Sequence, residues 1–375
     1  MTTIVKAASA AQFLSLIPKM LGYLPTQSLV LVPFSGKRSI GAMRFDLPSD
    51  ADAEDIARVA ATFIGMVCRL PEADAVAAIA YTDEYFAGRG LPHADLFDAL
   101  EDRADACGLR MNDALSVAAD GWGSHFDPAC PAGGRPLAEL AAEPRGAEDL
   151  TVTDGDQASG AELPRVDLAE KERTARAVAS LDAAARLLCG QGEPFADDHA
   201  RIDPQALAAA CVLDDLPTLF EEALDWDAES LAPFDAAALA WCLMRPALRD
   251  IALVQWCRGM NAGDEAFDAQ LRWEAGEEYP AHLAMQMWGE GERPDPDRLL
   301  AALTLLRRIA AAVPRDARAG VLATCGWLAW ALGRSTHAER YAVLACEIEP
   351  EHGLSEIVRS FVHAGHLPDW AFRRV

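Results

Sequence analysis

The segment from Leu21 to Pro48, LGYLPTQSLVLVPFSGKRSIGAMRFDLP, constrains the fold of this chain more than any other. The stretch before it, Ala8 to Leu21, repeats apolar residues at helical spacing and is closed by Gly22, a residue that ends helices in the left-handed conformation. Pro25 then prevents continuation of the helix because proline has no amide hydrogen. Two strand-like stretches follow across a tight turn and predict a β-hairpin: Ser28 to Pro33 and Ser39 to Leu47.

The chain then alternates helical and strand patterns. This alternation predicts an α/β domain, in which a mixed sheet carries flanking helices. Ala75 to Tyr81 is a run of small apolar residues typical of a buried strand, and Leu115 to Ala119 predicts a further one. The helices are expected between a cap at Ser49 or Asp50 and Pro71, and from Pro92 to Cys107.

The composition changes near Ala141, where Ala, Glu, Asp, Gly and Pro crowd together with few large apolar residues. We therefore expect a mixed α/β domain over residues 1–140, an exposed connection over 141–165 and an all-helical domain over 166–375. In the helical part, Asp203 before Pro204 and Asp295 before Pro296 each place a capping carboxylate ahead of a proline, which predicts two helix starts.

The net charge is −25, with 33 basic against 58 acidic residues, so the average field repels nucleic acid and anionic lipid. The longest apolar run, Val321 to Leu332, is too short to span a bilayer, which takes about 20 residues. The first residues are expected to form a folded helix and not a cleaved leader. These features predict a cytoplasmic protein that binds neither nucleic acid nor membrane.

Nine cysteines are scattered along the chain without a CxxC pair. Most fall on apolar helical patterns, where cysteine behaves as a small hydrophobe. We therefore expect reduced, buried thiols and neither a disulfide framework nor a zinc site.

Polar residues at the margin of the predicted sheet are the candidates for ligand binding. Thr26, Gln27 and Ser28 form the corner between the first helix and the first strand, where hydroxyls and free amides could meet a ligand or simply cap the turn. Arg44 and Asp46 share one face of the second strand, and Asp83 follows the end of the next. If Arg44, Asp46 and Asp83 converge, they make a polar pocket; otherwise Arg44 and Asp46 form a plain salt bridge.

A glycine- and proline-rich loop supplies Trp122 and Arg135 as further candidates, with Trp122 packing over the sheet. His125 and Cys130 in the same loop would permit a thiol nucleophile, although a single pair of this kind is a weak signal. His363 and His366 lack a clear third metal ligand. We assign no catalytic residue, no metal and no cofactor.

Two blocks, Leu21 to Asp46 and Asp120 to Leu137, resemble an uncharacterised, mainly actinobacterial family known only as a domain of unknown function. The resemblance implies that a pair of adjacent cysteines often stands in the second block, but here Ala129 precedes Cys130. Near the C-terminus, small residues at spacings of 7, 5, 7 and 5 resemble a tetratricopeptide helix pair, which we expect at about residues 299–366: Gly326, Gly333, Ala338, Ala345 and Pro350.

The sequence matches no phosphate-binding loop, nucleophile elbow or zinc-protease helix. We therefore expect a non-catalytic, regulatory protein that binds a protein or peptide through its helical domain, in an oligomeric state that the sequence leaves open. The alternative is an enzyme, a hydrolase or transferase, whose site lies at the sheet margin near Ser28, Arg44, Asp83 and Cys130.

Overall fold

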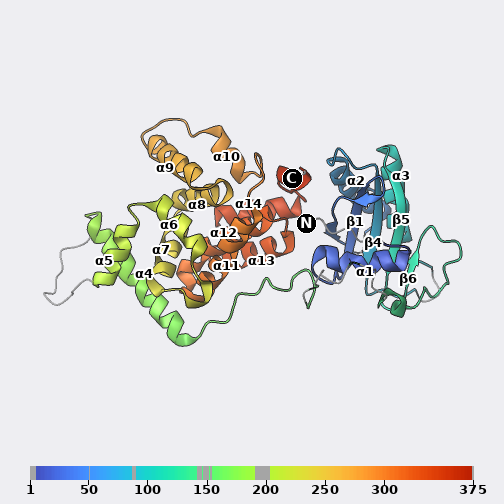
Figure 1. The fold of residues 1–375 in the computed structure, drawn as a ribbon, viewed down its shortest axis with the longest axis horizontal. Helices are drawn as coiled ribbons and strands as arrows, with labels where there is room; N and C mark the ends of the chain where they lie inside the picture. Colours follow the sequence, from blue (N-terminus) through green and yellow to red (C-terminus); the bar gives the residue numbers. More distant parts are fainter. Residues whose placement is uncertain are drawn as a thin grey trace. The chain divides into compact units, whose positions relative to one another are not determined.

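The computed structural model describes residues 6–49, 51–86, 90–141, 146, 152, 154–190 and 203–373. The chain divides into two compact units, Met1–Ser159 and Gly160–Val375. The first contains a mixed sheet with flanking helices and the second is helical, so the predicted fold class is confirmed (Figure 1). Much of the expected connection over 141–165 lies outside the described residues.

The sheet of the first unit has the order β2-β1-β4-β5-β6, with β3 pairing the same edge of β1 as β2. Neighbouring strands run antiparallel except for β4 and β5, which are parallel. The two parallel strands therefore end at the same edge of the sheet. The strands are β1 (Ser28–Ser35), β2 (Arg38–Ser39), β3 (Met43–Asp46), β4 (Ala75–Tyr81), β5 (Arg110–Val117) and β6 (Trp122–Ser124).

Both faces of the sheet are covered by helical structure. Successive side chains of β1 point to opposite faces, and the apolar ones pack into a separate core cluster on each face. Leu29 and Leu31 pack with α2 (Ala53–Cys68) and α3 (Ala94–Ala106) on one face. Val30 and Val32 pack with α1 (Ala10–Leu21) on the other. The unit is thus a three-layer arrangement in which all of these β1 side chains are fully buried.

Several predicted boundaries in this unit need correction. The hairpin partner is two short strands, β2 and β3, and β5 begins at Arg110 instead of Leu115. Helix α2 is capped by Asp52, whose carboxylate accepts the amide hydrogens of Glu54 and Asp55, and not by Ser49; Asp50 lies outside the described residues. Trp122, expected in a loop, lies in the short strand β6, which pairs with the end of β5.

The second unit buries a single large cluster of apolar side chains centred on Trp256, Trp327 and Trp330. The predicted caps are confirmed, since Asp203 and Asp295 accept the amide hydrogens of Gln205 and Asp297. Its α-helices are α4 (Leu168–Leu188), α5 (Pro204–Val212), α6 (Leu216–Glu222), α7 (Pro233–Leu243), α8 (Pro246–Arg258), α9 (Met260–Glu274), α10 (Ala281–Met287), α11 (Pro296–Ala312), α12 (Arg318–Ala331), α13 (Ser335–Cys346) and α14 (Gly353–His363).

The small residues of the predicted helix pair lie where α12 approaches α13. Ala338 and Ala345 are fully buried, and a Cβ atom on Gly326 would stand 3.2 Å from the carbonyl oxygen of Ala338. The close approach of the two helices therefore depends on small side chains. Their kinship with tetratricopeptide repeats stays a prediction.

The cysteines differ from expectation, because only Cys242, Cys257 and Cys325 are buried. Cys68, Cys107, Cys189 and Cys211 are exposed, and all nine are free thiols. All four exposed cysteines lie at or within one residue of the end of a helix, where the apolar stripe that faces the core stops. Among the described residues, no helix is both long enough and apolar enough to cross a bilayer.

Candidate functional site

A pocket of about 400 Å³ lies at the edge of the sheet where β4 and β5 end. Parallel strands commonly place ligand sites beyond their carboxyl ends, because the loops that follow the strands diverge there. We call it the carboxyl-edge pocket. It is lined by residues of α1, of the corner before β1, of the ends of β4 and β5 and of the 137–140 turn: Leu14, Ser15, Pro18, Leu24, Pro25, Thr26, Gln27, Tyr81, Thr82, Asp83, Val117, Ala118, Ala119, Leu137 and Leu140.

The corner beside this pocket is held by specific hydrogen bonds. Gln27 has a φ of 43°, an uncommon value for a residue with a side chain, and its Oε1 accepts the amide hydrogen of Asp83 at 3.2 Å. The amide and hydroxyl of Thr26 both donate to Gln157 Oε1, at 3.1 and 3.3 Å. The structure therefore brings together three predicted candidates, Thr26, Gln27 and Asp83, around one cavity.

Ser28, Arg44 and Asp46 form a separate cluster on the other side of β1. The Ser28 hydroxyl donates to the carbonyl oxygen of Thr26 at 2.6 Å and accepts from Arg44 Nε at 2.7 Å. Arg44 also forms an ion pair with Asp46. Because Ser28 is fully buried and none of the three lines the pocket, this cluster braces the β1–β3 pair, and Asp83 is not part of it.

Trp122 and Arg135 are paired through their backbones. The amide of each residue donates a hydrogen bond to the carbonyl oxygen of the other. The Arg135 guanidinium stands 5.7 Å from the centre of the Trp122 ring and is paired with Asp127, which lowers the pKa of that carboxyl group. Trp122 itself is buried among core residues of the sheet. The pair fixes the loop after β6 and does not line the pocket.

In the loop after β6, His125 and Cys130 do not form a catalytic pair. His125 Nε2 bonds Asp98 Oδ1 at 2.9 Å, whereas the Cys130 thiol lies 3.8 Å from the carbonyl oxygen of Pro131. A catalytic thiol needs its base within hydrogen-bond reach, and this imidazole is engaged elsewhere. His363 and His366 likewise bond different partners, Glu339 and the carbonyl oxygen of Trp288.

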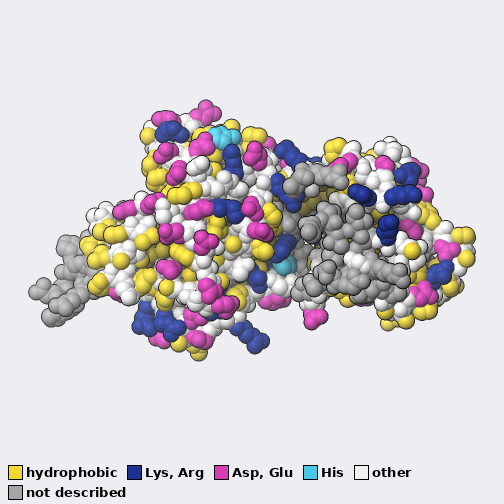
Figure 2. Space-filling model, viewed as in Figure 1, with side chains coloured by type: hydrophobic (Ala, Val, Ile, Leu, Met, Phe, Trp, Pro, Cys, Tyr) yellow, Lys and Arg dark blue, Asp and Glu magenta, His cyan; other side chains and the backbone are white. Residues whose placement is uncertain are grey.

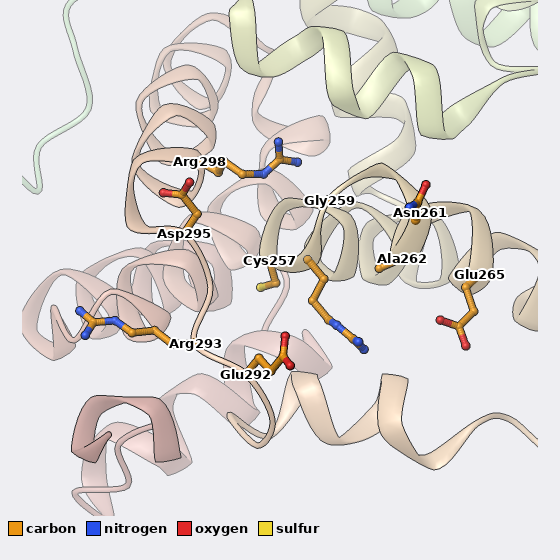
Figure 3. A pocket seen from close by; sticks show the side chains of 10 residues that line it. Cys257, Gly259, Asn261, Ala262, Glu265, Glu292, Arg293, Asp295 and Arg298 are labelled. Atoms are coloured by element: carbon orange, nitrogen blue, oxygen red, sulfur yellow. The ribbon is translucent and has the colours of Figure 1, made fainter. Parts of the chain in front are cut away.

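The helical unit holds a second cleft, of about 420 Å³, between the start of α9 and the segment leading into α11. Figure 3 shows its labelled side chains coming from both segments, with Asn261 and Glu265 on α9 and Asp295 and Arg298 at the start of α11. Its three arginines face an equal number of carboxylates: Arg258, Arg293 and Arg298 against Glu265, Glu292 and Asp295. The cleft therefore does not select a ligand by charge.

Structural contacts or burial account for two of the reactive groups of this cleft, Arg298 and Cys257. The Arg298 guanidinium donates to both oxygens of Glu221, at 2.6 and 2.9 Å, and this hydrogen bonding lowers the pKa of the Glu221 carboxyl group. Burial raises the pKa of the Cys257 thiol to about 12, so the thiol is protonated near neutral pH. A protonated thiol is a poor nucleophile, and the cleft contains no activated group of this type.

A comparison of the sequence with protein families identifies one that covers both units. The model of a family described as a domain of unknown function, DUF4192, matches residues 11–369. The chain belongs to this family. No curated protein and no solved structure matches the chain. A function for this DUF4192 protein is therefore inferred from the geometry of its structure.

One further surface of this DUF4192 protein was not predicted from its sequence. Trp273 at the end of α9 and Trp288 after α10 are 54% and 53% exposed. Helical spacing alone did not separate them from the buried tryptophans, because which face is covered depends on tertiary packing. Leu271 and Met285 of the same two helices are also exposed, and we use the name α9–α10 surface for the exposed side chains of Leu271, Trp273, Met285 and Trp288.

The α9–α10 surface lies in an acidic segment. Residues 260–292 contain a single arginine, Arg272, against eight carboxylates: Asp264, Glu265, Asp268, Glu274, Glu277, Glu278, Glu290 and Glu292. The two helices are joined by a 2.8 Å bond between Glu265 and His282. Figure 2 shows acidic and hydrophobic side chains interspersed where Figure 1 labels these helices.

Proposed function

We propose that this protein is a non-catalytic, regulatory protein that binds a basic, amphipathic segment of a partner protein on the α9–α10 surface. The exposure of Trp273 and Trp288 within an acidic segment is the observation that carries this proposal. We place the protein in the cytoplasm as part of the same proposal, since its net charge of −25 repels anionic lipid and nucleic acid.

Large exposed aromatic side chains favour association because each removes much apolar area from water when it is covered. Tryptophan is enriched among the few interface residues that contribute most of the binding free energy. Neighbouring carboxylates do not oppose docking of a segment whose lysines or arginines neutralise them, and they speed its encounter with the surface. An amphipathic helix with one apolar and one basic face satisfies both requirements.

Catalysis is less well supported by the geometry. Among the described residues that line the carboxyl-edge pocket, none is a cysteine, histidine, lysine or arginine. General acid–base chemistry at neutral pH most often uses such groups, placed within hydrogen-bond reach of each other. The alternative of a hydrolase or transferase at the sheet margin would have to operate with Asp83 and hydroxyl groups alone.

The proposal predicts selective binding of a designed peptide. An 18-residue helical peptide of leucine and lysine should bind the intact protein, whereas its leucine and glutamate counterpart should not. Replacing Trp273 by serine should weaken binding of the lysine peptide about tenfold, which corresponds to about 1.4 kcal/mol. Isothermal titration calorimetry in moderate salt measures both affinities.

The matched control is Leu168→Ser, because Leu168 is the most exposed large apolar side chain among the described residues and lies on α4, outside the acidic segment. Its affinity for the lysine peptide should equal that of the wild-type protein. Equal binding of the lysine peptide by wild-type protein and Trp273→Ser would contradict the proposed surface and leave only nonspecific charge attraction.

The carboxyl-edge pocket supports a second candidate function, the binding of a small molecule. Asp83 is its one formally charged group among the described lining residues, and most of the lining is apolar. Tyr81 also lines this pocket, and its buried hydroxyl has no hydrogen-bond partner among the described residues. Burial raises the pKa of this phenol. A neutral or cationic, largely apolar ligand fits these properties, and a nucleotide or phosphate does not.

This second candidate predicts which small molecules stabilise the protein. In a thermal-shift screen, neutral and cationic amphiphilic compounds should raise the melting temperature, and nucleotides should not. Ala119→Trp should abolish the shift because it fills the pocket from an exposed position at its rim. Ala61→Trp, on the exposed side of α2, is the control. Stabilisation by a nucleotide that Ala119→Trp removes would refute the ligand class, and turnover of any hit would favour the enzyme alternative.

A further inference from the structure

We propose that Cys68 and Cys107 are a site of reversible oxidation, at which a peroxide converts two neighbouring thiols into a disulfide. Both side chains are exposed and lie in the first unit. This inference does not depend on the proposed peptide or ligand binding.

The topology of the sheet brings the two cysteines together. Helix α2 leads into β4 and α3 leads into β5, and these two strands are parallel neighbours. Two helices that cross over in this way lie side by side on one face of the sheet and end at the same edge. Residues from both, including Val67 and Ala104, share one core cluster. Cys68 is the last residue of α2, and Cys107 caps the end of α3.

The two thiols are close enough to interact. Burial and, next, a hydrogen bond with the thiol of Cys107 raise the pKa of Cys68 to about 11. Both residues are exposed overall, so a small oxidant reaches the pair from solvent. A disulfide requires the sulfurs to move from this contact to an S–S distance of about 2.0 Å, a displacement available to two side chains at helix ends.

The chemistry balances with hydrogen peroxide as the oxidant. Because the raised pKa keeps the Cys68 thiol protonated near neutral pH, the thiolate of Cys107 attacks a peroxide oxygen, the O–O bond breaks, and a sulfenic acid and hydroxide form. The sulfur of the second cysteine then attacks the sulfenic sulfur, the S–O bond breaks, and water leaves after proton transfer. In sum, the two thiols lose two protons and two electrons, and one peroxide molecule becomes two water molecules. A dithiol reductant reverses the result by thiol–disulfide exchange.

The disulfide would tie together the ends of α2 and α3 at the edge where β4 and β5 begin. The carboxyl-edge pocket lies where the same strands end. Oxidation should therefore stabilise the first unit by restricting its unfolded chain without blocking that pocket.

Peptide mapping by mass spectrometry tests the site on the full-length protein. After brief treatment with a few equivalents of hydrogen peroxide and alkylation of the remaining thiols, the peptides containing Cys68 and Cys107 should appear linked and lack two hydrogens. Dithiothreitol should release them. Cys68→Ser and Cys107→Ser should each abolish the link, whereas Cys189→Ser and Cys211→Ser, at exposed thiols of the helical unit, should leave it intact.

Circular dichroism melting supplies a second measurement that does not depend on folding of the variants. Peroxide should raise the melting temperature of the wild-type protein by several degrees, and dithiothreitol should return it to the starting value. The proposal is overturned if Cys68 and Cys107 are oxidised singly to sulfinic acids, or if the link forms with another cysteine instead.

Discussion

Replacing Trp330 by alanine should destabilise the helical unit by about 3 to 5 kcal/mol, the usual cost of removing a large buried aromatic side chain. Trp330 is fully buried, and its ring centre lies 4.7 Å from that of Phe361 and 6.4 Å from that of Trp370. Its Nε1 donates to the carbonyl oxygen of His366 at 2.8 Å. The substitution therefore removes contacts that join α12, α14 and the C-terminal turn, and it leaves a cavity.

Urea denaturation followed by tryptophan fluorescence measures this loss, because eight of the nine tryptophans lie in the helical unit and only Trp122 in the first. Trp288→Ala is the matched control, since that ring is half exposed and its removal should cost much less. Equal midpoints for the two variants would show that Trp330 does not occupy the centre of the core.

Replacing Gly320 by leucine should cost about 3 kcal/mol or more, at the upper end of the range for overpacking. A Cβ atom on Gly320 would stand 2.3 Å from the carbonyl oxygen of Leu243 and 3.0 Å from the Cα atom of Met244. Both atoms belong to the backbone at the end of α7, which moves less readily than a side chain. Helices α7 and α12 would have to separate to admit the new side chain.

Gly353→Leu is the control for this substitution, because Gly353 is exposed at the start of α14 and a Cβ atom there would have no neighbour within 4 Å. Its urea midpoint should stay close to that of the wild-type protein. If Gly320→Leu were as stable as Gly353→Leu, the close contact between α7 and α12 would be wrong.

The elements predicted best from the sequence are those whose local signal agrees with their tertiary role. The run Ala75–Tyr81 is small, apolar and bounded by turns, and it is β4 with the predicted bounds. The Asp–Pro pairs at Asp203 and Asp295 combine a capping side chain with a fixed φ, so both helix starts were correct.

The elements that were missed depend on contacts distant in sequence. The strands β2 and β6 are two and three residues long, too short to show a periodic pattern, and they exist because β1 and β5 offer free edges. The start of β5 contains the polar residues Arg110 and Asp113, so the sequence pattern did not predict a strand there. Ser49, Asp50 and Asp52 are all suitable cap residues near the start of α2, and local sequence did not favour Asp52.

The candidate site was only partly visible in the sequence for the same reason. The corner before the first strand marked Thr26 and Gln27, and the end of a later strand marked Asp83; the structure places all three around one pocket. The apolar walls of that pocket come from Leu14, Leu137 and other residues whose patterns resemble ordinary core positions. Exposure of Trp273 follows from how α9 packs on its neighbours, and single-sequence periodicity contains no such information.

Hydrogen–deuterium exchange of the intact protein, with and without the leucine–lysine peptide, tests the central proposal most directly. The peptide should slow amide exchange within Met260–Glu292, the segment that carries the α9–α10 surface, and Trp273→Ser should greatly reduce this protection. Leu168→Ser should retain it in full. Protection of the first unit alone, or unchanged protection of Met260–Glu292 in Trp273→Ser, would contradict the account.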